Sequence, residues 1–548
     1  MVSHYKAVIG APRGKRRRSP GRVWPSLTAM AWIASASACQ LIGGIEEKEL
    51  VPAAGTGGTM TTAGTGAAGA GGDGAGGAGA AGGAGGGGPS CRGAVTEGMT
   101  QGLASTWSHV VTSAGDDSVG DIVFDPPRVL LAGARAGMIH IGRVSVDGPS
   151  AADWERTLSM GAARLTALGD AVLVTGTFTE SLAFPGCMPL APDVPGTAAI
   201  FVARLDANGG NCVWARAITS TVALSARAIA ADSGAAMYLA GELGGTIVPP
   251  PGACNETSFN GEDLFLAKFT NDGQCAWVRA AGSSGIAGQR TTTVAVRADP
   301  GGFVVAGGAY AAPIQGQVAF PGGDPLLAGN GDLNAFLAAF SLQGDHRWSR
   351  GFGGATEEQI SGIALDSEGN VLAAGHYQEA FDANADGGGP PCNLPEPDEQ
   401  GVLIMKLGSN GQVLWARGFG DQAFADGITM DVDDSVFITG SFRSVINFGG
   451  GDLTGPGDVR RVFVAKLDKD GHHLWSAELP SMDPGEGDDY ANVASAREGT
   501  LLVAGSYQGT VDFGGTVGQS MSAGADGFVI GLDGASGQAM RTSGRPQR

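Results

Sequence analysis

The chain has 548 residues, a formal net charge of −20 and 95 glycines. A chain this acidic lacks the basic surface that attracts nucleic acids and anionic lipid headgroups, so binding to either is disfavoured. Length alone does not set the number of domains, because most of the sequence is built from internal repeats.

Residues 1–38 have the features of an export signal. Basic residues between Arg13 and Arg22 precede an apolar stretch, Val23 to Ala34, that is short for a bilayer span. The following residues, Ala36 to Cys39, resemble a bacterial lipobox, which implies that Cys39 is lipidated and becomes the mature N-terminus. Gln40 then favours outer-membrane or surface display. Because Ala36 stands where a larger aliphatic residue is usual, secretion without a lipid and an uncleaved membrane anchor both stay open.

Residues 39–91 are predicted to be a disordered tether. From Ala53 to Gly88 the chain consists almost entirely of Gly, Ala and Thr, with Asp73 as its single charge. Such a composition has nothing to bury and cannot offset the entropy of folding. The repeat domain is therefore placed at residues 92–548.

Cysteine usage agrees with export, since six cysteines remain when Cys39 is set aside. In two successive copies of the repeat, one cysteine lies two residues before a tryptophan and another lies upstream in the same copy. This pattern predicts one disulfide inside each of these copies. The two remaining cysteines are then paired by elimination. A metal site is the rival interpretation, although no Cys-x-x-Cys pattern or histidine cluster occurs. The expected pairs are Cys187 with Cys212, Cys254 with Cys275, and Cys91 with Cys392.

Seven short apolar segments end in glycine, and the gaps between these glycines are 43, 65, 66, 68, 65 and 65 residues. One unit of about 65 residues is therefore repeated, with a shortened first copy. The glycines are Gly133, Gly176, Gly241, Gly307, Gly375, Gly440 and Gly505.

Each copy reads as four short β-strands separated by Asp, Asn and Gly turns. The segments are apolar over several consecutive positions, which indicates a sheet buried on both faces between two neighbours. We therefore expect an all-β fold, a seven-bladed β-propeller of four-stranded antiparallel blades, with six or eight blades as alternatives. An extra strand around Trp107 precedes the first complete copy and is expected to pair beside the last copy and close the ring.

Two sequences of the sixth copy, VFVAKLDKDGHHLWSAEL and VFITGSF, resemble the bacterial β-propeller repeat called SBBP. The resemblance covers about residues 105–540. It implies the propeller architecture but is nearly silent on function, because propellers serve in binding, scaffolding and catalysis.

Four acids occupy comparable positions in the loops that follow the tryptophan strands, and equivalent loops of a ring lie on one face. They are candidates for an acidic rim that holds a cation or the hydroxyls of a glycan, although solvated turn residues would give the same pattern. The four are Asp117, Glu358, Asp426 and Asp488.

The segment from Asp382 to Gly387 matches the first six positions of a calcium loop, with Asp382, Asn384 and Asp386 as candidate Ca²⁺ ligands. The twelfth position is Asn393 instead of the expected glutamate. An insert at a blade edge is the alternative interpretation, and no other cofactor is indicated.

No catalytic motif stands out, so the leading hypothesis is an exported, lipid-anchored binding or scaffolding module for a glycan or a protein at the outer membrane or cell surface. The membrane would be contacted through the N-terminal lipid only. A carbohydrate-active enzyme using two loop carboxylates is one alternative. A purely structural envelope protein is another.

Overall fold

The computed structural model describes residues 99–537, with gaps at 103–106, 126, 147–151, 221, 223, 249–253, 255–256, 282–289, 298–300, 312–319, 321, 324–325, 327–332, 355, 385–390, 480–487, 498, 514–516 and 521–523. The chain divides into two units, residues 1–34 and 35–548, and all described residues belong to the second. They form strands and no helix, which confirms the all-β class. In this part of the chain there is accordingly no helix capable of spanning a membrane. The predicted signal, tether and Cys39 lie outside the described residues.

Hydrogen bonds join the strands into five larger sheets and two short hairpins. Two sheets each contain four antiparallel strands in chain order. The first consists of β14 (Arg290–Arg297), β15 (Phe303–Ala311), β16 (Leu333–Ser341) and β17 (His346–Phe352). The second consists of β18 (Gln359–Leu365), β19 (Val371–Tyr377), β20 (Gly401–Leu407) and β21 (Val413–Phe419).

Two further sheets combine segments from both ends of the described chain. One has the order β2 (Trp107–Val111), β32 (Asp526–Asp533), β29 (Thr500–Tyr507) and β28 (Tyr490–Arg497). The other has the order β1 (Met99–Gly102), β27 (His473–Glu478), β26 (Arg461–Leu467), β23 (Val436–Phe442) and β22 (Ala423–Met430). The hairpins pair β24 (Val445–Ile446) with β25 (Leu453–Thr454), and β30 (Thr510–Asp512) with β31 (Val517–Gln519).

The remaining sheet has eleven strands and spans three copies of the repeat. Its strands are β3 (Asp117–Asp125), β4 (Arg128–Arg135), β5 (Met138–Ser145), β6 (Ala152–Leu168), β7 (Ala171–Phe178), β8 (Ala199–Asp206), β9 (Cys212–Ser220), β10 (Ser225–Ala231), β11 (Met237–Val248), β12 (Thr257–Phe269) and β13 (Cys275–Ala281).

The structure thus has five sheets where seven separate ones were predicted, and the difference arises in the first three copies. Strand β6 is 17 residues long, and it pairs with β5 up to Met160 and with β7 from Gly161 onward. The shortened first copy leaves no loop at this point, so one strand belongs to both copies. Strand β11 also pairs with β9 near its end, where Ile247 lies opposite Ser220.

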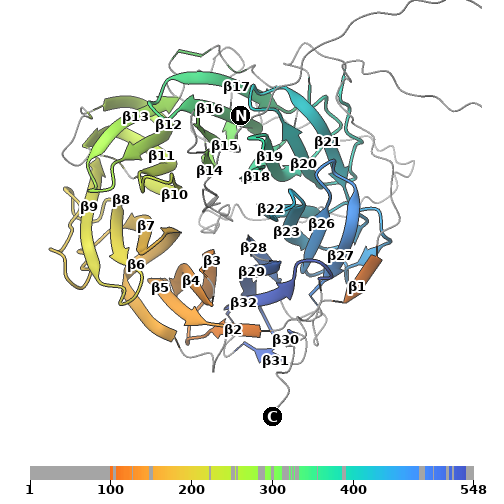
Figure 1. Ribbon diagram of the computed structural model, residues 1–548, viewed down its shortest axis with the longest axis horizontal. Coiled ribbons are helices and arrows are strands. Elements are labelled where there is room, and N and C mark those ends of the chain that lie inside the picture. Colours follow the sequence, from red (N-terminus) through yellow and green to blue (C-terminus); the bar gives the residue numbers. More distant parts are fainter. Residues whose placement is uncertain are drawn as a thin grey trace, which may run out of the picture. The chain divides into compact units, whose positions relative to one another are not determined.

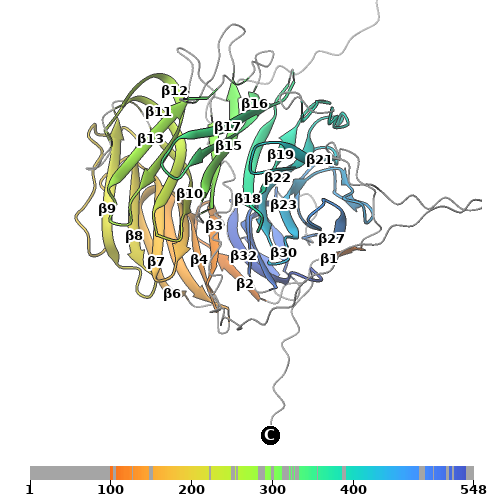
Figure 2. The ribbon, with the colours of Figure 1, turned by 45° about the horizontal axis from the view of Figure 1, so that its top comes forward.

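The innermost strands contact one another in a closed succession: β3, β6, β10, β14, β18, β22, β28 and again β3. In Figure 1 these strands surround the centre of the ring, and Figure 2 shows the sheets from an oblique direction. The repeat domain is therefore a β-propeller of small antiparallel blades, as predicted.

The predicted closure of the ring is confirmed. Strand β2 pairs antiparallel with β32, with Trp107 opposite Gly531, so the N-terminal strand completes the last sheet. Strand β1 adds a contact that the sequence did not suggest, because it lies parallel to the outer strand β27, with Met99 opposite Trp475.

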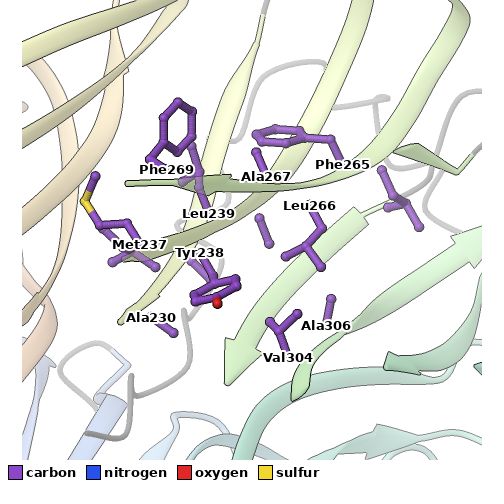
Figure 3. Close-up of a cluster of buried hydrophobic side chains, with 14 of the residues drawn as sticks. Ala230, Met237, Tyr238, Leu239, Phe265, Leu266, Ala267, Phe269, Val304 and Ala306 are labelled. Atoms are coloured by element: carbon purple, nitrogen blue, oxygen red, sulfur yellow. The ribbon is translucent and has the colours of Figure 1, made fainter. Parts of the chain in front are cut away.

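Each sheet is buried on both faces, which explains the runs of consecutive apolar residues. Figure 3 shows Tyr238 of β11 and Leu266 of β12 on the side of Val304 and Ala306 of the next sheet, with Phe265 and Phe269 of β12 on the opposite side. The cluster continues on the other side into the preceding copy. The predicted burial of a sheet between two neighbours is confirmed.

Six tryptophans join successive copies through one recurring contact. The indole Nε1 donates to a backbone carbonyl in the turn after the third strand of the next copy, as Trp348 does to Ser409 at 2.9 Å. The ring also lies against a glycine of that turn, here Gly411, whose φ of +79° disfavours other residues. The six are Trp154, Trp214, Trp277, Trp348, Trp415 and Trp475.

Two of the predicted disulfides are confirmed. Cys187 pairs with Cys212 and Cys254 pairs with Cys275, with Cα–Cα distances of 5.6 and 5.5 Å. Cys392 is also a disulfide cysteine and is fully buried. Its expected partner, Cys91, lies outside the described residues. The two bonds are consistent with an oxidising, extracellular environment.

Candidate functional site

The candidate site lies where the chain enters the inner strands β22 and β28. In a four-stranded antiparallel sheet, the connection into the first strand and the connection between the second and third strands open on the same side. Phe424 and Asp426 near the start of β22, Arg443 after β23, Arg460 before β26 and Asp488 before β28 are therefore on one face. A cation–π contact and hydrogen bonds join these residues.

A β-bulge sets the positions of Phe424 and Asp426. The pairing of β22 with β23 shifts around Asp426, which is an extra residue on the inner strand. On the opposite strand is Gly440, where a Cβ would lie 2.0 Å from the Phe424 carbonyl oxygen. The glycine is therefore required by the close approach of two backbones within one sheet. The same contact recurs at five other repeat glycines, which are Gly133, Gly176, Gly241, Gly375 and Gly505.

Arg460 stacks on an aromatic side chain. Its guanidinium carbon lies 4.2 Å from the centroid of the Phe424 ring, a cation–π contact between two half-buried side chains. The imidazole of His376, on β19, meets the same ring edge-to-face with centroids 4.9 Å apart. Burial and the nearby charge of Arg460 lower the pKa of His376 to about 4, so its imidazole is neutral at physiological pH.

Asp488 connects three segments of the site. The Arg460 backbone N–H donates to its Oδ1 at 2.8 Å, while Arg443 Nη2 and the Tyr490 hydroxyl donate to its Oδ2 at 2.9 and 3.0 Å. Burial alone would raise the pKa of Asp488, but these donors outweigh it and hold the pKa below its ordinary value. Asp488 is thus an ionised anchor. Burial and the charge of Asp488 raise the pKa of Tyr490 to about 12, so its hydroxyl remains a donor.

Two guanidinium groups of the site keep unused donors. Among the described residues, no acceptor hydrogen-bonds any guanidinium nitrogen of Arg460, and its Nη1 is buried. The Nε of Arg443 is likewise buried without an acceptor in that part of the chain. Asp426 supplies a further negative charge near Arg460. A positively charged, partly buried donor set therefore faces this side of the ring.

The site differs from its counterparts in the other copies. The register position of Phe424 is occupied by Tyr490 in the last copy. In the first three copies the same position carries a small residue: Ser118, Ala162 or Ser225. Aromatic side chains are thus concentrated in two adjacent copies, and the repeat scaffold does not require them.

The four acids predicted to form a rim do not form one. Asp426 and Asp488 both lie near Arg460. Asp117 is buried and accepts a hydroxyl and a backbone N–H at 2.7 Å each. Glu358 is fully buried, and burial raises its pKa to about 7 although a backbone N–H and a hydroxyl hydrogen-bond to it. Asp117 and Glu358 therefore offer no carboxylate to a ligand at the surface.

The predicted calcium loop is described only at its start. Asp382 Oδ1 accepts the backbone N–H groups of Asn384 and Cys392, the first at 2.9 Å. Asn384 is buried. Asp386 lies outside the described residues. The part of the loop that is described uses the Asp382 carboxylate to hold the backbone, and Ca²⁺ binding stays a prediction.

The chemistry available in the site favours binding. In the described part of the chain no group of three or more His, Cys, Asp or Glu side chains is arranged to hold a metal ion. A glycosidase needs a carboxylic acid with a raised pKa as its proton donor. Asp488 has a lowered pKa instead, and its oxygens are already hydrogen-bonded. The arrangement offers an aromatic surface, guanidinium donors and a phenol.

Comparisons with known proteins do not assign the chain to a family. No family model matches the chain. A match of 213 residues at 28% identity links it to an "Uncharacterized WD repeat-containing protein L264" of Acanthamoeba polyphaga mimivirus, covering 34% of this chain and 15% of that relative. The matched residues thus span only 15% of the length of that relative.

Solved structures of low similarity include the Dos1 propeller, with a TM-score of 0.38 and 9% identity over 78% of this chain and 95% of that one. A PL25 ulvan lyase has a TM-score of 0.40 and 8% identity over 78% and 97% of the two chains. A puromycin hydrolase mutant has a TM-score of 0.37 and 13% identity over 82% and 57%. Similarities this low assign no function to the chain.

Sequence reasoning found Asp426 and Asp488 but missed the residues that surround them. Comparing the copies at the position before the inner-strand bulge would have singled out Phe424 and Tyr490, because the first three copies have small residues there and the fifth has Gln359. The pair Arg460-Arg461 was also visible as two adjacent cations in an acidic chain. Its contact with Phe424 was not visible, since 36 residues separate the two along the sequence.

Proposed function

We propose that this protein is an exported binding module whose propeller face over β22 and β28 holds a glycan, with each sequence copy serving as one blade. In this proposal Cys39 carries a lipid and the Gly-rich segment separates the ring from an outer membrane or cell surface. The observation that carries the binding function is the half-buried Arg460 guanidinium, stacked on Phe424 and without a hydrogen-bond acceptor among the described residues.

The chemistry of the site fits glycan binding better than nucleic-acid binding or glycosidase activity. Saccharide rings present C–H groups to aromatic faces and hydroxyl or acidic groups to planar donors, which Phe424, Tyr490 and Arg443 supply next to Arg460. Nucleic acid is disfavoured by the net charge of −20. The ionised Asp488 also favours binding over the glycosidase alternative, because it cannot act as a proton donor near neutral pH.

The binding function is tested on an oligosaccharide array with the purified repeat domain. Arg460→Gln should remove the binding that the parent protein shows. Arg347→Gln is the matched control, because that guanidinium also stacks on an aromatic ring, Phe303, but donates to two backbone carbonyls. Equal losses in both variants, or no binding by the parent, would contradict the proposal.

The anchoring function has a separate test. Globomycin, which blocks lipoprotein signal cleavage, should cause accumulation of the precursor, and mass spectrometry should find an acyl chain on Cys39. Cys39→Ser should release the protein from the membrane fraction. Unchanged processing together with an unmodified Cys39 would exclude the lipid anchor and leave the binding proposal standing.

A further inference from the structure

We infer that the bound saccharide carries an oxyanion, which is either a carboxylate or a sulfate ester. Arg460 is the main residue that binds this group. This inference rests on the proposed glycan-binding function and narrows it to acidic saccharides. Its starting point is the guanidinium group of Arg460, which is partly withdrawn from water and has no hydrogen-bond acceptor within the described residues.

The orientation of Arg460 suits an oxyanion. A guanidinium group presents parallel N–H donors in one plane, and this fork matches the two oxygens of a carboxylate or sulfate. Stacking on the Phe424 ring at 4.2 Å restricts the plane of the guanidinium before any ligand arrives. The backbone N–H of Arg460 is fixed to Asp488 Oδ1 at 2.8 Å, which holds the base of the side chain. A preorganised group loses less entropy on binding.

The acids of the site do not take the place of the ligand. Asp488 is already bonded to Arg443 and Tyr490, with its remaining contact made to the backbone of Arg460 instead of its side chain. Asp489, the next residue, is fully buried and pairs with Arg461 at 3.2 Å. Asp426 contributes a further negative charge near Arg460. The guanidinium is therefore balanced in charge while its donors remain available.

A second donor lies beside the first. Arg443 uses Nη2 for Asp488, and its Nε is buried without an acceptor in the described part of the chain. The Arg443 side chain is 36% exposed, so it can reorient toward a ligand. Two guanidinium groups can then surround one anionic group, while the Tyr490 hydroxyl stays bonded to Asp488 and the sugar ring rests against the aromatic side chains.

The net charge of the chain limits the size of the anion. A charge of −20 repels a long polyanion at a distance, whereas a single acidic group in contact with Arg460 is attracted locally. The Debye length at physiological ionic strength is about 8 Å, which screens the more distant carboxylates. We therefore expect a saccharide with one or two acidic groups at the site, and weaker binding at very low salt.

The experiment uses an array on which each uronate oligosaccharide is printed beside its methyl ester, and each sulfated oligosaccharide beside its desulfated form. The purified full-length protein should bind at least one acidic member about tenfold more tightly than its neutral partner, the difference expected for a charge-assisted bidentate contact. Preference for uronates or for sulfated sugars identifies which oxyanion is bound.

Variants assign the preference to one residue. Arg460→Gln should abolish the difference between acidic and neutral partners, and Arg460→Lys should keep only part of it because a point charge replaces the fork. Arg347→Gln should leave the preference unchanged. Circular dichroism and thermal unfolding establish that each variant is folded.

Three outcomes would overturn the inference, and they are distinguishable. If neutral and acidic partners bind equally and Arg460→Gln has no effect on their ratio, the oxyanion is excluded while glycan binding stands. If no saccharide on the array binds, the proposed function fails and the inference fails with it. An equal effect of Arg347→Gln would exclude Arg460 as the specific ligand.

Discussion

The guanidinium of Arg460 lies 4.2 Å from the ring centroid of Phe424 and reaches it from the connection before β26, 36 positions later in the chain. This contact aligns a charged group from one connection with an aromatic residue of the inner strand. A cation–π contact of this kind contributes roughly 0.5–2 kcal/mol, depending on its desolvation.

Phe424→Leu is expected to weaken saccharide binding by about tenfold, because it removes both the stacking surface and the support of the guanidinium. Isothermal titration with the tightest array ligand measures the change. Ser225→Leu, at the same register position in the third copy, is the matched control and should leave the affinity unaltered. A similar loss in both variants would mean that the site lies elsewhere.

Gly411→Ala is expected to destabilise the ring by about 1–3 kcal/mol, since its φ is +79° and a Cβ would lie 2.7 Å from the Trp348 ring. Gly457→Ala is the control, because φ there is +90° but no atom lies within 4 Å of the added Cβ. The free energy of unfolding of each variant is measured by urea denaturation, and the difference between the two values gives the effect of the contact with tryptophan. Equal losses would show that backbone strain alone is responsible.

His140 is expected to make stability fall with decreasing pH. The side chain is 1% exposed, and neither ring nitrogen has a hydrogen-bond partner among the described residues. His140 lies opposite Gly133, at a register position where other copies have an apolar residue such as Phe201. Burial lowers its pKa, reinforced by Arg135 and His109 and opposed by Glu155 and Asp117.

A lowered pKa in the folded state means that the unfolded state takes up the proton more readily. The stability contributed by neutral His140 is therefore present at pH values above its unfolded pKa of about 6.5 and is lost as the pH falls below it. His140→Phe should raise stability and reduce this pH dependence, as measured by urea midpoints at pH 8 and pH 5. His376 and His473, whose pKa values are also lowered, should preserve part of the slope. An unchanged slope in His140→Phe would contradict the assignment.

Removing the bond between Cys187 and Cys212 should cost about 2–4 kcal/mol, because the bond closes a 25-residue segment and restricts the unfolded chain. The double variant Cys187→Ser/Cys212→Ser, compared with the parent by thermal unfolding, measures this cost. A reducing agent should lower the melting temperature of the parent more than that of the variant. If it lowers both equally, this bond does not contribute to stability.

Much of the architecture could be predicted because the information was local and repeated. The spacing of glycines, the tryptophan strands and the extra strand at Trp107 were enough for the propeller and its closure. Cysteine positions within copies were enough for two disulfides. The repeat glycines that gave this spacing are structural, as at Gly440, where a Cβ would strike the Phe424 carbonyl of the same sheet.

The sheet count and the site depended on information that is not local. The gap of 43 residues showed a short first copy, but only the structure shows that β6 continues through it and joins two copies. A turn acid looks the same in sequence whether it is solvated or buried. Asp117 and Glu358 are buried and hydrogen-bonded, whereas Asp426 and Asp488 are half-buried near a guanidinium from another segment.

The parallel pairing of β1 with β27 has a mechanical consequence. A pull on the chain at Met99 reaches the β1–β27 hydrogen bonds before it reaches the closing strand β2. A load directed along β1 is shared by several bonds at once. The non-covalent closure of the ring between β2 and β32 is thereby shielded from tension applied at Met99.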